Sequence, residues 1–372
     1  MAKVLKNKYN STGERCVDAC LNYGELRYIN EDGSPMNIEI PCDKYEEAVS
    51  DFEDRIREGI IHQNVETKEV LKRGAFTYNQ AKNIAIDGKV RGLAFFEIDG
   101  SVECDHILGM SGSIEYALAL WNGDSAKEAL LKSIIRAMKV YGEEFINGLN
   151  LDNTVDINSY IRFAKNVSTM DYITDIKLYK SRNYAIDNEI QIEGIGGKIK
   201  NIGAMNLILG LIGSLIGLIL IQISTNFGKL IDNKILFLVL NLLFISTGGW
   251  IFMSVPKRII DKYVKHNTKM IMDLFNEELE KVTYDNLLTE KEAHIVLKNI
   301  TKGEVSKLLI DMKGSVNKKV SSNNLVSKES KFMLDARKTV VLPSEYDIKE
   351  GLSKLVGSYN EKLTSEYNID SI

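Results

Sequence analysis

Four side chains of this sequence are of the types that bind zinc. Cys16 and Cys20 are four residues apart, so both thiols would share one face of a helix, and Cys104 and His106 could lie together at the end of a strand. Thiolate sulfur and imidazole nitrogen are the ligands of structural zinc sites. The spacing differs from that of a zinc finger. It therefore leaves two alternatives, a zinc site or unrelated reduced thiols, and it favours the second.

No arrangement of catalytic side chains is apparent elsewhere in the sequence. The stretch EGIGGKIK at 193–200 lacks the GxxxxGK[ST] spacing of a phosphate-binding loop, and Ile199 stands where a hydroxyl would bind magnesium. The four histidines lie in unrelated contexts: His62, His106, His266 and His294. We therefore predict that the chain is not an enzyme and that it has no catalytic, cofactor-binding or metal-binding residues.

Two long apolar segments occupy the middle of the chain. Residues 204–223 and 235–254 carry no formal charge. As helices, each would span roughly 30 Å, the thickness of the hydrocarbon core of a bilayer. The polar linker 224–234 is short, so the two segments are predicted to form an antiparallel transmembrane hairpin. More basic residues border the hairpin than lie in its linker, so the positive-inside rule places both termini in the cytoplasm.

Small residues in these segments predict close helix packing. Glycines at 203, 210 and 217 repeat every seven residues, and 213 and 217 form a GxxxG pair. Small residues allow helix backbones to approach closely in lipid. The face is either a contact between copies of the chain or the seat of the second span, and both interpretations stay open. The predicted packing residues are Gly203, Gly210, Gly213, Gly217, Gly248 and Gly249.

The flanking regions are charge-rich, and their sequence patterns predict folded domains. The predicted fold class is an α+β cytoplasmic N-terminal region (1–200), the transmembrane hairpin (204–254) and a mostly α-helical cytoplasmic C-terminal region (255–372). The net charge of −4 and the pI near 5.8 argue against a nucleic-acid partner.

Capping boxes and turn residues locate several elements within these regions. Residues 25–29 and 36–40 are expected to form a β-hairpin. A helix is predicted after Asp43, and two short helices around Gly74, the second running from Thr77 to Gly88. Residues 107–121 and 125–149 are predicted to form a buried helical pair, or alternatively a surface-associated one. The Ser- and Asn-rich stretch 313–330 is expected to be a linker, and 348–363 a final helix.

Three parts of the chain resemble an uncharacterised group of bacterial multi-pass membrane proteins that have an FTYxQAxNIA stretch and a glycine-zipper membrane segment. These parts are RGAFTYNQAKNIA (73–85), LWNGDSAKEAL (120–130) and the glycine-rich segment. The apolar segments are richer in Leu and Ile here than the Gly/Ala-rich ones of that group. The resemblance implies a multi-pass protein of the bacterial cytoplasmic membrane and no activity.

Together these features predict an integral membrane protein whose cytoplasmic domains bind partners. The expected partners are the lipid bilayer, further copies of the chain as a homo-oligomer, and a cytoplasmic protein. A self-associating scaffold or partner-binding protein is the favoured function. The alternative is a pore-forming or membrane-perturbing effector.

Overall fold

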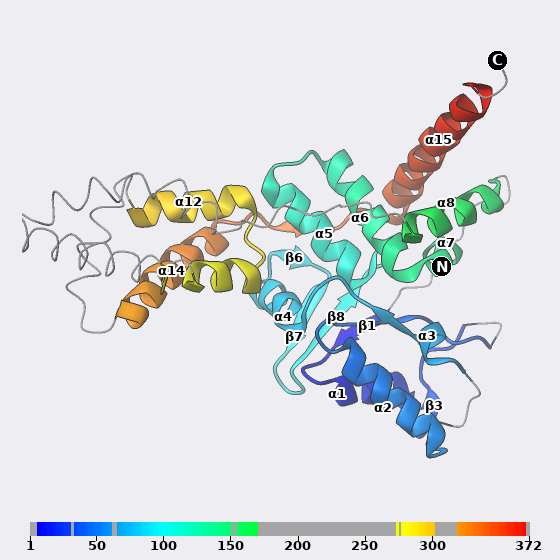
Figure 1. The fold of residues 1–372 in the computed structure, drawn as a ribbon, viewed down its shortest axis with the longest axis horizontal. Helices are drawn as coiled ribbons and strands as arrows, with labels where there is room; N and C mark the ends of the chain where they lie inside the picture. The colour runs from blue at the N-terminus through cyan, green and yellow to red at the C-terminus, as the bar shows by residue number, and fades with distance from the viewer. Residues whose placement is uncertain are drawn as a thin grey trace, which may run out of the picture. The chain divides into compact units, whose positions relative to one another are not determined.

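The computed structural model describes residues 6–30, 33–61, 65–149, 151, 155–169, 273–274, 277–301 and 318–369. The chain divides into two units, and the first combines three separate stretches, 1–179, 281–296 and 330–372 (Figure 1). The second unit comprises 180–280 and 297–329; its described residues include the end of α12 (Glu290–Thr301) and most of α14 (Lys318–Asp335).

The N-terminal part of the first unit has its own small core. Buried residues of two helices, among them Val17 and Phe52, pack against Ile38, Ile40 and Leu71 of two parallel strands. The elements are β1 (Lys6–Tyr9), α1 (Gly13–Cys20), β2 (Leu21–Asn22), β3 (Glu25–Leu26), β4 (Ile38–Ile40), α2 (Tyr45–Arg57), α3 (Thr67–Val70) and β5 (Leu71–Arg73).

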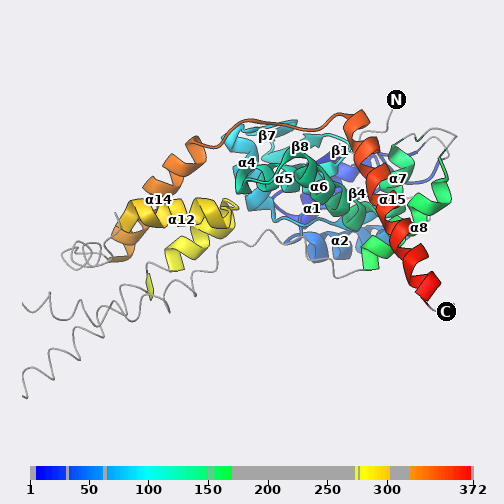
Figure 2. The same ribbon diagram turned by 90° about the horizontal axis from the view of Figure 1, so that it is seen from above.

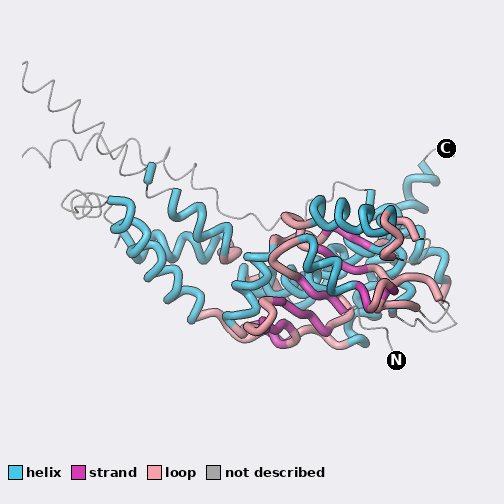
Figure 3. Tube along the Cα trace, turned by 90° about the horizontal axis from the view of Figure 1, so that it is seen from below, coloured by secondary structure: helices cyan, strands magenta, loops and turns pink. Residues whose placement is uncertain are grey.

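A three-stranded antiparallel sheet in the order β1-β8-β7 connects this part to the rest of the unit. One face of the sheet packs against helices, and the other carries charged side chains such as Lys8 and Glu103, which form an ion pair at 3.1 Å. One-sided burial produces the alternation of buried and exposed residues in β7 (Leu93–Phe96) and β8 (Ser101–Asp105). Figure 3 shows the strands lying against the helices.

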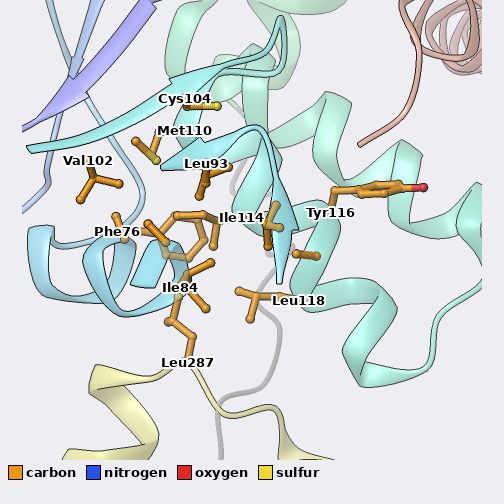
Figure 4. Close-up of a cluster of buried hydrophobic side chains, with 14 of the residues drawn as sticks. Phe76, Ile84, Leu93, Val102, Cys104, Met110, Ile114, Tyr116, Leu118 and Leu287 are labelled. Carbon is orange, nitrogen blue, oxygen red and sulfur yellow. The ribbon is translucent and has the colours of Figure 1, made fainter. Parts of the chain in front are cut away.

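Helices α4 (Tyr78–Asp87) and α5 (Gly109–Asn122) cover the buried face of the sheet. Phe76 precedes α4 and lies in the same core, with Val102 of β8 and Ile114 of α5 (Figure 4). The helix ends follow local sequence. Thr77 and Gln80 form the expected capping box of α4, and Gly88 ends it in a left-handed conformation.

Helix α6 (Ala126–Tyr141) lies antiparallel to α5 and begins with the expected capping box of Ser125 and Glu128. Its other side packs against α7 (Glu143–Gly148), α8 (Ile157–Thr169) and α15 (Glu345–Ile369). The core of this bundle includes Met138, Phe163, Ile348 and Leu352. The predicted buried pair is confirmed for α5 and α6, but the range 125–149 is divided at Gly142 into α6 and α7.

Within the last stretch of the first unit, an extended segment, residues 336–344, follows α14 and leads into α15 (Figure 2). We call residues 336–344 the strap. Its strand β9 (Val340–Val341) pairs in parallel with β6 (Val90–Arg91). Strands from opposite ends of the chain therefore form one two-stranded sheet.

The predicted transmembrane architecture requires correction. Among the described residues no helix is both long enough and apolar enough to cross a bilayer. The apolar helix α5 has 14 residues, or about 21 Å, which falls short of the hydrocarbon core. The longer α15, with 25 residues, carries Glu and Lys along its length. The described fold is a mixed α/β region with helices, in place of a fold organised around a membrane hairpin.

The same finding overturns the predicted multi-pass membrane localisation. The segments 204–223 and 235–254 lie outside the described residues, as do the predicted domain boundaries at 200, 204, 254 and 255. The glycines assigned to helix packing also lie outside them: Gly203, Gly210, Gly213, Gly217, Gly248 and Gly249.

Three local predictions are also wrong. The hairpin expected from 25–29 and 36–40 is limited to its turn, where an isolated bridge joins Ile29 to Pro35 and the Met36 amide donates to the Tyr28 carbonyl. The strands beyond it have other partners, because β3 pairs with β2 and β4 pairs in parallel with β5. The first of the two helices expected around Gly74 shrinks to one turn, α3. The Ser- and Asn-rich stretch expected to be a linker is largely helical, within α14.

Candidate functional site

The four side chains of the zinc alternative do not converge. The thiols of Cys16 and Cys20 are in the N-terminal core and donate to backbone carbonyls, whereas Cys104 is buried in the core beneath the sheet. Burial raises the pKa of the Cys16 and Cys104 thiols to about 12, which disfavours the thiolate that a metal would need. No group of three or more His, Cys, Asp or Glu side chains in the described parts of the chain is placed to hold a metal ion.

The densest convergence of polar groups surrounds Glu39, on β4. Its Oε1 accepts hydrogen bonds from the hydroxyl of Tyr9, at 2.5 Å, and from that of Ser111. Its Oε2 accepts from the Tyr141 hydroxyl and from the Ser111 amide, at 3.3 Å. Ser111 lies in the first turn of α5, where the positive end of the helix dipole favours a carboxylate.

Two glycines make room for this carboxylate cluster. A Cβ at Gly74 would collide with the Tyr9 hydroxyl, and one at Gly109 would collide with the Tyr141 hydroxyl. Gly109 also has a φ of +67°, a backbone conformation that residues other than glycine rarely adopt. The sequence therefore provides both the hydrogen-bond donors and the space around Glu39.

The pKa values of Tyr9 and Tyr141 are both raised well above the ordinary value of a tyrosine. Burial is the largest cause, and the nearby charge of Glu39 raises them further. Both phenols therefore keep their protons and act as donors. Tyr9, Glu39 and Ser111 have no solvent exposure and Tyr141 is 2% exposed, so a substrate has no access. We interpret the carboxylate cluster as a sealed connection between the N-terminal part, α5 and α6.

Sequence reasoning missed Glu39 because a single glutamate in MNIEI looks like the exposed position of an alternating strand. Ile38, Glu39 and Ile40 are in fact all buried. The nearest sequence signals were the glycine before AFTY and the glycine before MSGS, at 74 and 109, where larger residues would not fit.

An open groove of about 620 Å³ lies elsewhere on the first unit, between α6, the strap and α15. Its apolar lining includes Leu130, Leu131 and Leu342. Tyr116 of α5 also lines it, and Figure 4 shows the Tyr116 oxygen directed away from the buried cluster. That hydroxyl has no hydrogen-bond partner within the described ranges. The groove thus combines apolar walls with an unpaired polar group, as binding sites do.

The strap, which forms one wall, is held by Arg337. The guanidinium donates to Glu292 through Nε and Nη2, at 2.8 and 2.9 Å, and to the carbonyl of Leu287 at 3.0 Å. It also lies 4.1 Å from the ring centroid of Trp121, whose Nε1 donates to the Lys338 carbonyl. A forked ion pair stacked on an indole fixes both the position and the orientation of the strap.

His106 fixes the other end of the strap. Nδ1 accepts from the amide of Leu108, so Nε2 carries the proton and donates to the carbonyl of Pro343, at 3.0 Å. Burial lowers the pKa of His106, which favours this neutral form. The residue considered as a zinc ligand therefore joins the start of α5 to the wall of the groove.

Comparison with known proteins gives one partial match. Residues 2–57 match the model of the YeeR C-terminal domain family. No curated protein and no solved structure matches the chain. The matched residues hold Tyr9 and Glu39 but none of the residues that line the groove. Over residues 2–57, this chain is similar to the YeeR C-terminal domain.

Proposed function

We propose that this chain is a binding protein without catalytic activity and that it recruits a partner protein through the groove between α6, the strap and α15. The observation that carries this proposal is the contrast between the two polar sites. The carboxylate cluster is sealed and fully paired, whereas the groove is open and its Tyr116 hydroxyl has no partner among the described residues.

The construction of the groove supports a role in binding. Its walls come from segments far apart in the chain, and Arg337 and His106 hold them in place by hydrogen bonds. A wall fixed before binding loses little conformational entropy when a partner arrives. Exposed residues on the rim, such as Val341 at 61% exposure, supply apolar area for the contact.

Site-specific photocrosslinking tests the proposal. A benzoylphenylalanine at Val341, in the full chain expressed in its native cells, should give a discrete adduct with one protein, which is then purified. The same probe at Ile98, an exposed residue that does not line the groove, is the matched position. A second copy of the chain would also be detected as a partner.

The purified partner should then bind the wild-type chain. Ala126→Trp, which fills the groove from the exposed first turn of α6, should weaken binding about tenfold or more, which is the loss of about 1.4 kcal/mol. Ile98→Arg should not weaken it. Equal adducts at both positions, or binding unaffected by Ala126→Trp, would contradict the proposal.

A further inference from the structure

The outer edge of β9 is available for strand pairing. β9 and β6 form a sheet of two strands, and the amide of Val340 donates to the Lys89 carbonyl at 2.6 Å. Backbone groups of successive residues in a strand point to opposite sides. The amide and carbonyl of Val341 therefore point away from β6, to the edge where no described strand is paired with β9. Val341 lines the groove.

The charges on the groove are unevenly paired. Lys354 pairs with Glu350, and the Asp347 carboxylate accepts from the amide and hydroxyl of Ser344. Lys127 is exposed, lies in the first turn of α6, and has no ion pair within the described ranges. The positive end of the α6 dipole adds to its potential. Two charges on the rim therefore lack an ion pair among the described residues: the positive charge of Lys127 and the negative charge of Asp347, whose hydrogen bonds come from neutral groups.

We propose that the groove binds an extended segment of a partner protein by strand addition. The main chain of the segment pairs with the outer edge of β9, its alternate apolar side chains enter the groove, and an Asp or Glu side chain faces Lys127. This inference rests on the proposed function and specifies the partner. An exposed strand edge gives affinity through main-chain hydrogen bonds, and the adjoining groove gives specificity.

A volume of about 620 Å³ suits a few residues of such a segment, because pockets of 300–1,000 Å³ bury most of a ligand of that size. The Tyr116 hydroxyl would donate to an acceptor of the bound segment. A helix would leave the edge of β9 unpaired and is therefore the less complementary occupant.

A peptide library provides the probe for this inference. Random dodecapeptides displayed on phage are selected on the full-length chain and counter-selected on Ala126→Trp, whose melting temperature must equal that of the wild type. Enriched peptides should alternate apolar residues and contain Asp or Glu. In a synthetic version, methylation of alternate backbone nitrogens should reduce affinity about tenfold, as expected for the loss of a hydrogen bond.

The charge contact has its own control. Lys127→Glu should weaken a peptide whose acidic side chain faces Lys127, and exchange of that acid for Lys should restore binding to the variant. Lys68→Glu, at an exposed position of α3 that does not line the groove, should leave affinity unchanged. The selection could instead yield peptides that need the groove but tolerate N-methylation and carry apolar residues at helical spacing. This result would overturn strand addition and leave the proposed function standing. Recovery of no peptide after the counter-selection on Ala126→Trp would overturn the inference, and the crosslinking result would then decide the proposed function separately.

Discussion

At the scale of single residues, Glu39 shows how a charge is accommodated without solvent. Three hydroxyl groups and one amide donate to its two oxygens, and every donor comes from a different part of the fold than β4. A buried carboxylate without such donors would carry a large desolvation cost. The cluster therefore requires that the N-terminal part and α5–α6 adopt their relative positions together.

Glu39→Gln should lower the free energy of unfolding by about 3 kcal/mol. The substitution replaces one carboxylate oxygen, which accepts hydrogen bonds, with an amide NH₂ group, which would face the donors of the cluster without accepting from them. Urea denaturation of the full chain measures the loss. Glu97→Gln, at an exposed position, should change stability by less than about 0.5 kcal/mol. Equal midpoints for the two variants would show that Glu39 does not connect these parts.

Gly109→Ala should destabilise the protein by about 3 kcal/mol or more. The alanine would have to adopt a positive φ, which is disfavoured, and its Cβ would collide with Tyr141. Gly88→Ala is the matched control, since Gly88 has a φ of +64° and no atom within 4 Å of the added Cβ. Its cost should be about 1–2 kcal/mol, the conformational penalty alone. The difference in urea midpoint isolates the collision, and no difference would refute it.

At the scale of elements, the strap depends on interactions that titrate. The pKa of His106 is lowered by burial from an ordinary value of 6.5, so the unfolded chain binds this proton more readily than the folded chain. The stability that neutral His106 contributes is therefore complete above about pH 6.5 and is lost as the pH falls below it.

His106→Gln should reduce this pH dependence. Glutamine keeps a donor for the Pro343 carbonyl but does not titrate. Melting temperatures measured from pH 7.5 to pH 5 should fall less steeply for His106→Gln than for the wild type. His294→Gln, at an exposed position, should retain the wild-type slope. Parallel curves for His106→Gln and the wild type would remove His106 as the cause.

Elements with local signals could be predicted from the sequence, and elements that depend on distant pairing could not. The capping boxes at Thr77 and Ser125 form as expected, since donor and acceptor are three residues apart, and Thr289 forms another with Glu292. The box expected at Asp43 does not form, because its carboxylate accepts from the amide of Tyr78 instead. Tertiary competition of this kind leaves no trace in local spacing.

The same distinction applies to the candidate site. The sequence predicted a helix at α6 and a final helix, which supply two walls of the groove, although α15 begins earlier and ends later than expected. The strap could not be predicted, because β9 has two residues and its partner β6 lies in the first third of the chain. The membrane prediction depended on segments outside the described residues, and the helices that are described did not support it.

At the scale of the whole molecule, the first unit is assembled from three stretches of chain and should unfold cooperatively. Leu352→Ala in α15 removes a fully buried side chain and should lower the hydrogen-exchange stability of amides in β8 by about 2–5 kcal/mol. Tyr346→Ala, in the same helix but 75% exposed, should have little effect on β8. Unchanged protection of β8 in Leu352→Ala would mean that α15 detaches independently.

The order of the three stretches has a consequence during synthesis. A ribosome makes α6 and Tyr116 long before it makes the strap and α15, so the nascent chain carries one wall of the groove without the other. Leu130 and Ile134, against which Gly351 packs, are uncovered during that interval. The proposed recruitment would therefore begin only when residues 336–354 have left the ribosome, and a transcript cut short before them would yield a chain that lacks the strap and α15 walls of the groove.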